Sequence, residues 1–203
     1  MDASTAPPEE APRLARCDAL LARVENLFNL VAALCIFALM FLGMAQVLGR
    51  KLFNAPMSGY IDFVELSMAT FAFLGIAYCQ RLGGHVRMEM VLKFTHGRAH
   101  WAMELAGTAL GLLVVTILIY YGFTHFERAW TLGDSTIDAE LPVWPSKLLV
   151  PTAFSLLWLR LALQLWGFAR LLRHPAAPPI AVPEILSVEK LAAKEIEESA
   201  EKR

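Results

Sequence analysis

The feature that most constrains this chain is an apolar run from Leu27 to Leu48 that contains no charged residue. At about 1.5 Å per residue, a helix of this length crosses a hydrocarbon core of ~30 Å. The residues before it include Glu9, Glu10 and Asp18, and its apolar core is longer than that of a signal peptide. The run therefore predicts an uncleaved first transmembrane helix.

Three further apolar segments follow, at about residues 60–80, 105–126 and 148–168. Hydrophobic residues make up 57% of the chain and charged residues 18%, against roughly 45–50% and 25% in globular proteins. The segments predict an all-α integral membrane protein with four transmembrane helices. We expect the membrane domain to cover residues 27–170.

Lysine and arginine in the short loops indicate the orientation. The second loop carries four basic residues, whereas the two basic residues of the third loop are accompanied by four acidic ones. This pattern predicts that the second loop and both termini are cytoplasmic and that the first and third loops lie outside. Arg50 and Lys51 in the first loop count against it.

The segments flanking the spans have patterns of their own. Residues 1–26 form a cytoplasmic N-terminal amphipathic segment, whose apolar stripe runs at helical spacing into the start of the first span; it predicts either an interfacial helix or a plain helical extension of that span. The members of the stripe are Leu14, Cys17, Leu21, Val24 and Phe28. The second loop, residues 81–104, predicts a short helix on the membrane surface. Residues 171–203 read as a cytoplasmic proline-rich linker and a charged tail, disordered or weakly helical.

The sequence contains little that indicates an enzyme. His96 and His100 have the spacing of two ligands on one helical face, but the glutamate of a zinc-protease motif is missing between them. All five histidines fall in loops or at span ends. We therefore expect no enzyme activity, no cofactor and no metal site. The net charge of −1 gives no reason to expect a nucleic-acid partner.

A charged side chain at membrane depth is expected to have a partner of opposite charge, because an unpaired charge there is costly. Asp62 and Glu65 are three residues apart at the start of the second span, and Arg50 ends the first span on the same side. Antiparallel neighbours would bring them together, so we predict an Arg50–Glu65 or Arg50–Asp62 ion pair. The functional alternative is a glutamate that couples proton or ion movement.

Arg160 lies deeper, within the fourth span. It either snorkels to the cytoplasmic side or faces another protein; the second option is favoured because a lipid-facing arginine costs roughly 2–3 kcal/mol. Gly107 and Gly111 at the start of the third span form a small-xxx-small pair that permits close helix approach.

A distinctive motif follows the second span, where FLGIAYCQRLGGHVRMEM joins an apolar helix to a polar loop. Together with GRKLFNAP at residues 49–56 and LPVW at residues 141–144, it resembles the small membrane subunit of TRAP transporters (tripartite ATP-independent periplasmic transporters), the DctQ-like family. The resemblance covers about residues 27–170. Gly59 and Tyr60 stand where many members have tryptophan, and Met88 stands where valine is common.

The resemblance implies a multi-pass protein of a bacterial inner membrane with both termini cytoplasmic. The implied partners are a large membrane subunit, a periplasmic substrate-binding protein and membrane lipid. Such systems import organic acids with a sodium gradient, and the small subunit would brace the large one as a scaffold.

Within the loop motif, Gly83 and Gly84 are expected to end the second helix, Arg81 and Arg87 to hold the loop on the cytoplasmic side, and His85 and Glu89 to tie the turn to neighbouring helices. The assembly candidates are Arg50, Asp62, Glu65, Gly75, Arg81, Gly83, Gly84, His85, Arg87, Glu89, Pro142, Trp144 and Arg160. The alternative function is an independent four-span ion-coupled exporter with Glu65 as its coupling carboxylate.

Overall fold

The computed structural model describes residues 10–55, 57–82 and 98–173, and these residues are almost entirely helical. The helices are α1 (Glu10–Leu52), α2 (Tyr60–Leu74), α3 (Ile76–Arg81), α5 (Arg98–Leu132) and α6 (Trp144–Arg173). Within this part of the chain the β-type pairing is an isolated bridge between Ser135 and Pro142.

Four helical segments are long and apolar enough to cross a membrane, which confirms the predicted fold class. They are Leu14–Leu52, Tyr60–Arg81, Trp101–Leu132 and Trp144–Arg173. Helix α1 has 43 residues, which at ~1.5 Å per residue is about 65 Å. It runs without a break through the predicted boundary at residue 26. The interfacial helix predicted in the second loop falls largely on residues 83–97, outside the described residues.

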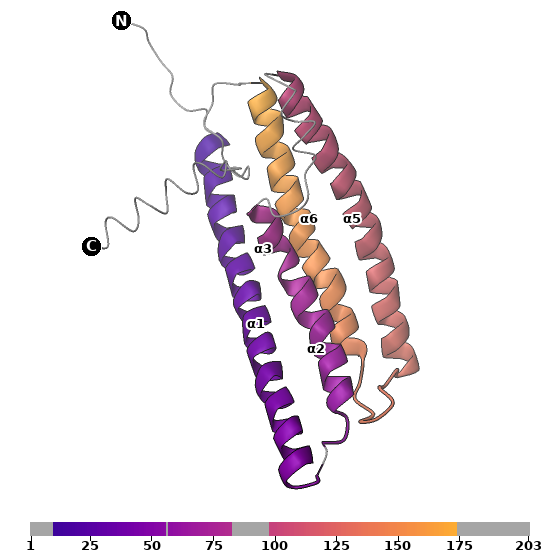
Figure 1. Ribbon diagram of the computed structural model, residues 1–203. Helices are drawn as coiled ribbons and strands as arrows, with labels where there is room; N and C mark the ends of the chain where they lie inside the picture. The colour runs from indigo at the N-terminus through magenta and orange to yellow at the C-terminus, as the bar shows by residue number, and fades with distance from the viewer. Residues whose placement is uncertain (1–9, 56, 83–97, 174–203) are drawn as a thin grey trace, which may run out of the picture.

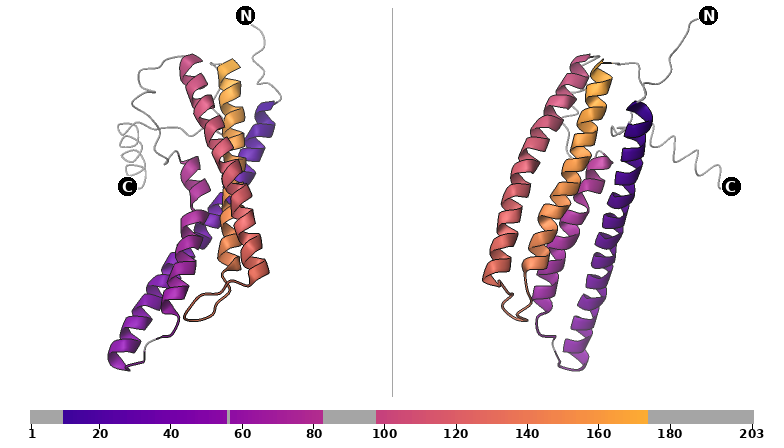
Figure 2. Two further views of the ribbon diagram at one scale, coloured as in Figure 1. Left: turned by 90° about the vertical axis from the view of Figure 1, so that its right-hand side faces the viewer. Right: turned by 180° about the vertical axis from the view of Figure 1, so that it is seen from behind.

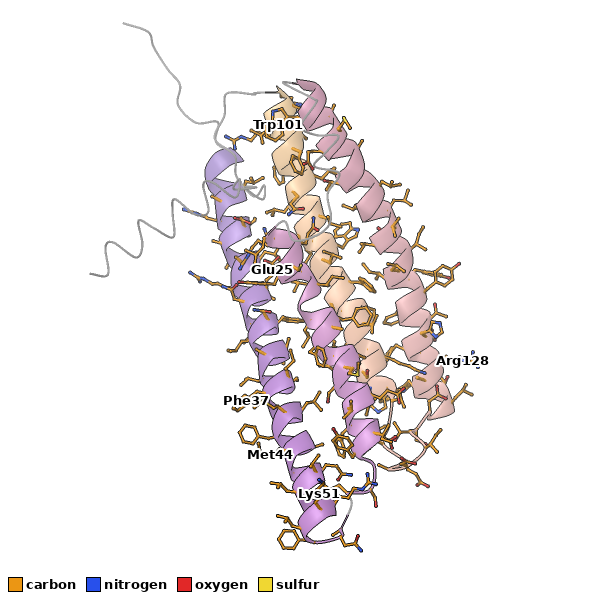
Figure 3. The ribbon with its side chains drawn as sticks, viewed as in Figure 1. Glu25, Phe37, Met44, Lys51, Trp101 and Arg128 are labelled. Carbon is orange, nitrogen blue, oxygen red and sulfur yellow. The ribbon has the colours of Figure 1, made fainter. Side chains whose placement is uncertain are left out.

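The four spans form a row and not a square bundle. Helix α1 packs on α2, α2 with its continuation α3 packs on α6, and α6 packs most extensively on α5 (Figure 1). The view from behind shows the same order reversed, and the edge-on view shows that α1 and α5, at opposite ends of the row, incline in opposite directions (Figure 2). The side chains of Phe37 on α1 and Arg128 on α5 project outward from the two edges of the row (Figure 3).

Helix α6 holds the centre of the row because its apolar residues are buried on both sides. Leu156, Leu157 and Leu161 form the core with Val115 of α5 and Ala77 of α3. A buried proline, Pro151, lies inside α6. Its ring lies against α5, where a Cβ added at Gly122 would stand 3.5 Å from the Pro151 Cβ.

The close approach between α5 and α6 is therefore made at Gly122 and not at the glycine pair singled out in the sequence. Gly107 has nothing within 4 Å of its added Cβ, and Gly111 meets the Leu161 side chain at 3.9 Å. Farther along the interface, Trp158 Nε1 donates a hydrogen bond to Thr116 Oγ1 at 2.9 Å. This bond satisfies the indole N–H on the exposed side of the α5–α6 contact.

Candidate functional site: a buried charged cluster joining α1, α3 and α6

The inward face of α1 carries two acids among its apolar residues. Leu14, Asp18, Leu21, Glu25 and Phe28 follow one another at spacings of four and three, so they share one side of the helix. Leu14 and Glu25 are each 1% exposed, and Leu21 and Phe28 pack against the core. This face therefore buries carboxylate as well as hydrocarbon.

The apolar stripe proposed from the sequence is thus only partly right. Cys17 and Val24 are exposed, whereas Asp18 and Glu25 take the inward positions beside them. A search for apolar residues at helical spacing does not detect acidic residues that are buried because they pair with a buried cation.

That cation is Arg160 of α6, which is 1% exposed. Its Nε and Nη2 donate to Glu25 Oε1 and Oε2, both at 2.6 Å, and its Nη1 donates to Asp18 Oδ1 at 2.5 Å. The contact with Glu25 is bidentate, the strongest arrangement between a guanidinium and a carboxylate. The sequence reading favoured a partner chain for Arg160; the structure places both of its acidic partners within this chain.

Arg81, the last residue of α3, approaches the same carboxylate from the other side. Its Nη1 lies 3.3 Å from Glu25 Oε2 and donates to the Ala22 carbonyl at 3.0 Å, and its Nη2 donates to Asn26 Oδ1 at 2.6 Å. Figure 3 labels Glu25 on α1, level with the end of α3. Arg81 therefore clamps α3 to α1, a more specific role than the general positive charge inferred from the sequence.

The cluster as a whole is formally neutral, with two guanidiniums facing two carboxylates. An unpaired charge at membrane depth costs several kcal/mol, and a paired, hydrogen-bonded one far less. Beside it, Gln80 Nε2 donates to Gln164 Oε1 at 2.9 Å, and Gln164 is 1% exposed. These bonds link α1, α3 and α6 at the level where α3 ends, so the arrangement holds the three helices in fixed positions.

Close to the α1–α2 turn, Asp62 ties the start of α2 to the α5–α6 loop. Its Oδ2 accepts the backbone N–H of Ala139 at 2.7 Å and that of Asp138 at 3.2 Å, both in the α5–α6 loop. Just before α2, Gly59 is buried with φ 74°, and a Cβ added there would stand 2.4 Å from the Ala139 Cβ. Only glycine fits this contact, because both the left-handed backbone and the close approach exclude a side chain.

The α5–α6 loop is itself held by an ion pair. Lys147 Nζ lies 2.8 Å from Asp134 Oδ2, and this hydrogen bond, helped by the positive charges of Lys147 and Arg128, lowers the pKa of the Asp134 carboxyl. At the start of α6, the Trp144 ring meets Trp130 edge-on at 4.9 Å. Tryptophans at the ends of adjacent spans are typical of the aromatic belt at a membrane surface.

The ion pair predicted between Arg50 and either Asp62 or Glu65 is absent from the described part of the chain. Asp62 is engaged with backbone N–H groups, while the side chains of Arg50 and Glu65 are both exposed. Antiparallel packing brings α1 and α2 together as expected, but Asp62 is bonded to the α5–α6 loop instead of Arg50.

The remaining sequence candidates divide into two groups. Gly75 separates α2 from α3 with φ −77° and ψ −14°, so the span continues through it almost as one helix. Pro142 belongs to the bridge with Ser135 and Trp144 opens α6. Gly83, Gly84, His85, Arg87 and Glu89 lie outside the described residues, so their roles stay predictions.

Sequence reasoning missed the acids of the cluster. Asp18 and Glu25 are seven residues apart, two helical turns, and this spacing was the available signal. The apolar stripe running through the same face concealed it. Among the described residues, no group of three or more histidine, cysteine or acidic side chains could hold a metal ion.

The four helices long and apolar enough to span a membrane, joined by buried ion pairs between α1, α3 and α6 and by the contact of α2 with the α5–α6 loop, define a multi-pass helical membrane protein. The family model described as the DctQ component of tripartite ATP-independent periplasmic transporters matches residues 39–171, and the chain belongs to this family. Over 109 residues it is 28% identical to the C4-dicarboxylate TRAP transporter small permease protein DctQ of Rhodobacter capsulatus. That alignment covers 52% of this chain and 48% of the relative, so the chain spans about half the length of the curated relative that it matches.

Proposed function

We propose that this chain is the small membrane subunit of a sodium-driven TRAP transporter that imports organic acids, and that it braces the large permease subunit. Membership of the DctQ family supports the transporter role. The partners would be a large membrane subunit and a periplasmic substrate-binding protein, in a bacterial inner membrane with both termini cytoplasmic.

The observation that carries the bracing role is the buried bidentate pair between Arg160 and Glu25. Substrate transport needs groups that change partners, whereas this pair is fixed by matched geometry on two helices and is closed to solvent, with both side chains 1% exposed. A neutral, fully bonded cluster stiffens the contact between α1 and α6. A rigid row of helices with two broad faces suits a brace for a larger moving partner.

Glu65, the coupling carboxylate of the alternative exporter, is exposed on the surface of α2. The described acids buried in the row, Glu25 and Asp62, are bonded to guanidinium or backbone N–H groups. This distribution favours the brace over an independent exporter.

The test is co-purification from detergent after co-expression of this chain with the neighbouring genes, among which a large permease is expected. We expect the permease to follow a tag on this chain, and sodium-dependent uptake in proteoliposomes to require the permease, this chain and the binding protein together. Ion-coupled transport by this chain alone would refute the proposal. Failure of the permease to co-purify would also count against it.

The orientation can be tested with cysteine labelling in intact spheroplasts. Ile137 in the α5–α6 loop is 95% exposed, and native Cys17 is exposed near the N-terminal end of α1, on the opposite side of the predicted membrane. An Ile137→Cys variant without the native cysteines should react with a membrane-impermeant maleimide, and a variant that retains only Cys17 should react after permeabilisation. The reverse pattern would invert the proposed topology.

A further inference from the structure

An open groove of about 680 Å³ lies where the end of α1 meets the start of α2 and the tip of the α5–α6 loop. We name it the outer groove. Its walls include Gln46, Val47 and Arg50 of α1, Tyr60 and Ile61 of α2, and Asp138 of the loop. The volume is within the range of ~300–1,000 Å³ that is typical of ligand sites. Figure 3 labels Lys51, the neighbour of Arg50, at this end of α1.

The outer groove contains two opposite charges that do not meet. Arg50 and Asp138 both line it, yet the described residues form no ion pair between them. The nearby carboxylate that could have neutralised Arg50, that of Asp62, is bound to backbone N–H groups. The groove therefore presents a cation and an anion across an open space, which is complementary to a zwitterion.

Further polar groups stand beside Arg50. Gln46 Oε1 accepts the N–H of Met57 at 2.8 Å, an arrangement that leaves the amide NH₂ of Gln46 as a donor. The Tyr60 hydroxyl reaches α1 at Gly43, where an added Cβ would lie 3.3 Å from it. Donors around a guanidinium favour an anionic oxygen, and Arg is well suited to phosphate.

The rest of the groove is apolar and exposed. Val47 is 57% and Ile61 66% exposed, and both belong to helices long and apolar enough to span a membrane. A site with separated charges at one end and hydrocarbon at the other fits a molecule that is polar at the head and apolar in the tail. A small water-soluble zwitterion would leave the apolar wall uncovered.

We propose that the outer groove binds a phospholipid with a phosphoethanolamine headgroup. The phosphate accepts hydrogen bonds from Arg50 and Gln46, the ammonium group meets Asp138, and the first part of an acyl chain lies against Val47 and Ile61. The proposal does not depend on the transporter assignment, because it rests on the groove alone.

The experiment measures lipid binding to the purified full-length chain by native mass spectrometry with defined lipids. Phosphatidylethanolamine should bind more tightly than phosphatidylglycerol, which lacks the ammonium group. An Arg50→Gln variant should lose about tenfold or more in affinity for phosphatidylethanolamine, the loss expected for one charge-assisted hydrogen bond. Lys51→Gln, which removes a neighbouring charge that does not line the groove, is the matched control and should change little.

The Asp138→Asn variant tests the second charge without disturbing a helix. It should weaken the binding of phosphatidylethanolamine and leave the binding of phosphatidylglycerol unchanged, so the preference between the two lipids should disappear. Because Asp138 is exposed in a loop and holds Asp62 through its backbone N–H, the folded state should persist. Monodisperse elution and an unchanged helical circular dichroism spectrum check this.

Three results would overturn the proposal. Equal losses of phosphatidylethanolamine affinity in Arg50→Gln and Lys51→Gln would mean that the lipid is held only by general attraction to surface charge. Equally tight binding of water-soluble glycerophosphoethanolamine would make the groove a solute site. In an Ile61→Cys variant, a co-purified protein could protect the cysteine from maleimide where added phosphatidylethanolamine does not. That result would make the outer groove a protein interface.

Discussion

Replacing Arg160 by leucine tests the central ion pair of the fold. The substitution removes both 2.6 Å hydrogen bonds to the Glu25 carboxylate and the contact with Asp18. Glu25 would then remain 1% exposed with only Arg81 beside it, at 3.3 Å. A buried carboxylate that loses its main partner is the costly outcome, because its charge stays out of water.

The expected cost of Arg160→Leu is about 3–5 kcal/mol of unfolding free energy, the usual loss on breaking a buried pair. Glu25→Leu should cost a similar amount by orphaning the guanidinium. The double variant Glu25→Leu/Arg160→Leu should recover most of the loss and lie within about 1–2 kcal/mol of wild type, because a buried pair and a packed apolar pair have similar net free energies. The loss of the Arg160 guanidinium should cost little at Asp18, because the Asp18 side chain is 33% exposed.

Unfolding of the purified protein in mild detergent, titrated with a denaturing detergent and followed by circular dichroism, measures these differences. Arg173→Leu is the matched control, because Arg173 is an exposed arginine of the same helix. It should change the unfolding free energy by less than about 0.5 kcal/mol. A double variant destabilised by the sum of the two single losses would refute the pairing argument, because independent sites add and coupled ones do not.

Three smaller predictions concern the other contacts. Gly59→Ala should reduce the yield of folded protein far more than Gly133→Ala, as seen by size-exclusion chromatography, because both glycines have positive φ but only Gly59 has a neighbour within 4 Å; equal yields would contradict the steric argument. Asp134, whose pKa is lowered mainly by the Lys147 hydrogen bond, stabilises the loop above the unfolded pKa of about 3.9, and this contribution should disappear as the pH falls through the lower folded pKa. The stability difference between wild type and Asp134→Asn should therefore be constant from pH 7 to about 5 and decline below about 4; a difference that persists in acid would contradict the assignment. Trp158→Phe removes one hydrogen bond to the threonine hydroxyl of α5 and should cost about 0.6–1.5 kcal/mol in the same unfolding assay, and a larger loss would indicate a packing role for the indole ring.

Much of the fold was predictable because spanning a membrane is a local property. A charge-free run such as 27–48 needs no partner to be identified, since its length and apolarity already meet the requirement of the bilayer. The motif after the second span indicated the family in the same local way, and the family comparison confirmed it.

The charged residues were harder to place because their partners lie far away in the chain. Arg160 and Glu25 are separated by 135 positions, and whether they meet depends on the tilt and rotation of two helices. The acidic pair near the start of α2 shows the same dependence. Asp62 turns toward the loop and Glu65 toward the surface, although both begin the same span three residues apart.

By itself, the sequence determined that this protein has four segments long and apolar enough to cross a membrane and that it belongs with the small subunits of TRAP transporters, because apolar length and short motifs can be recognised without knowing any contact. Only the tertiary structure decided which charges are neutralised inside the chain and which remain open. Helix packing sets the rotation of each span, and that rotation buries Arg160 against α1 and leaves Arg50 facing the outer groove.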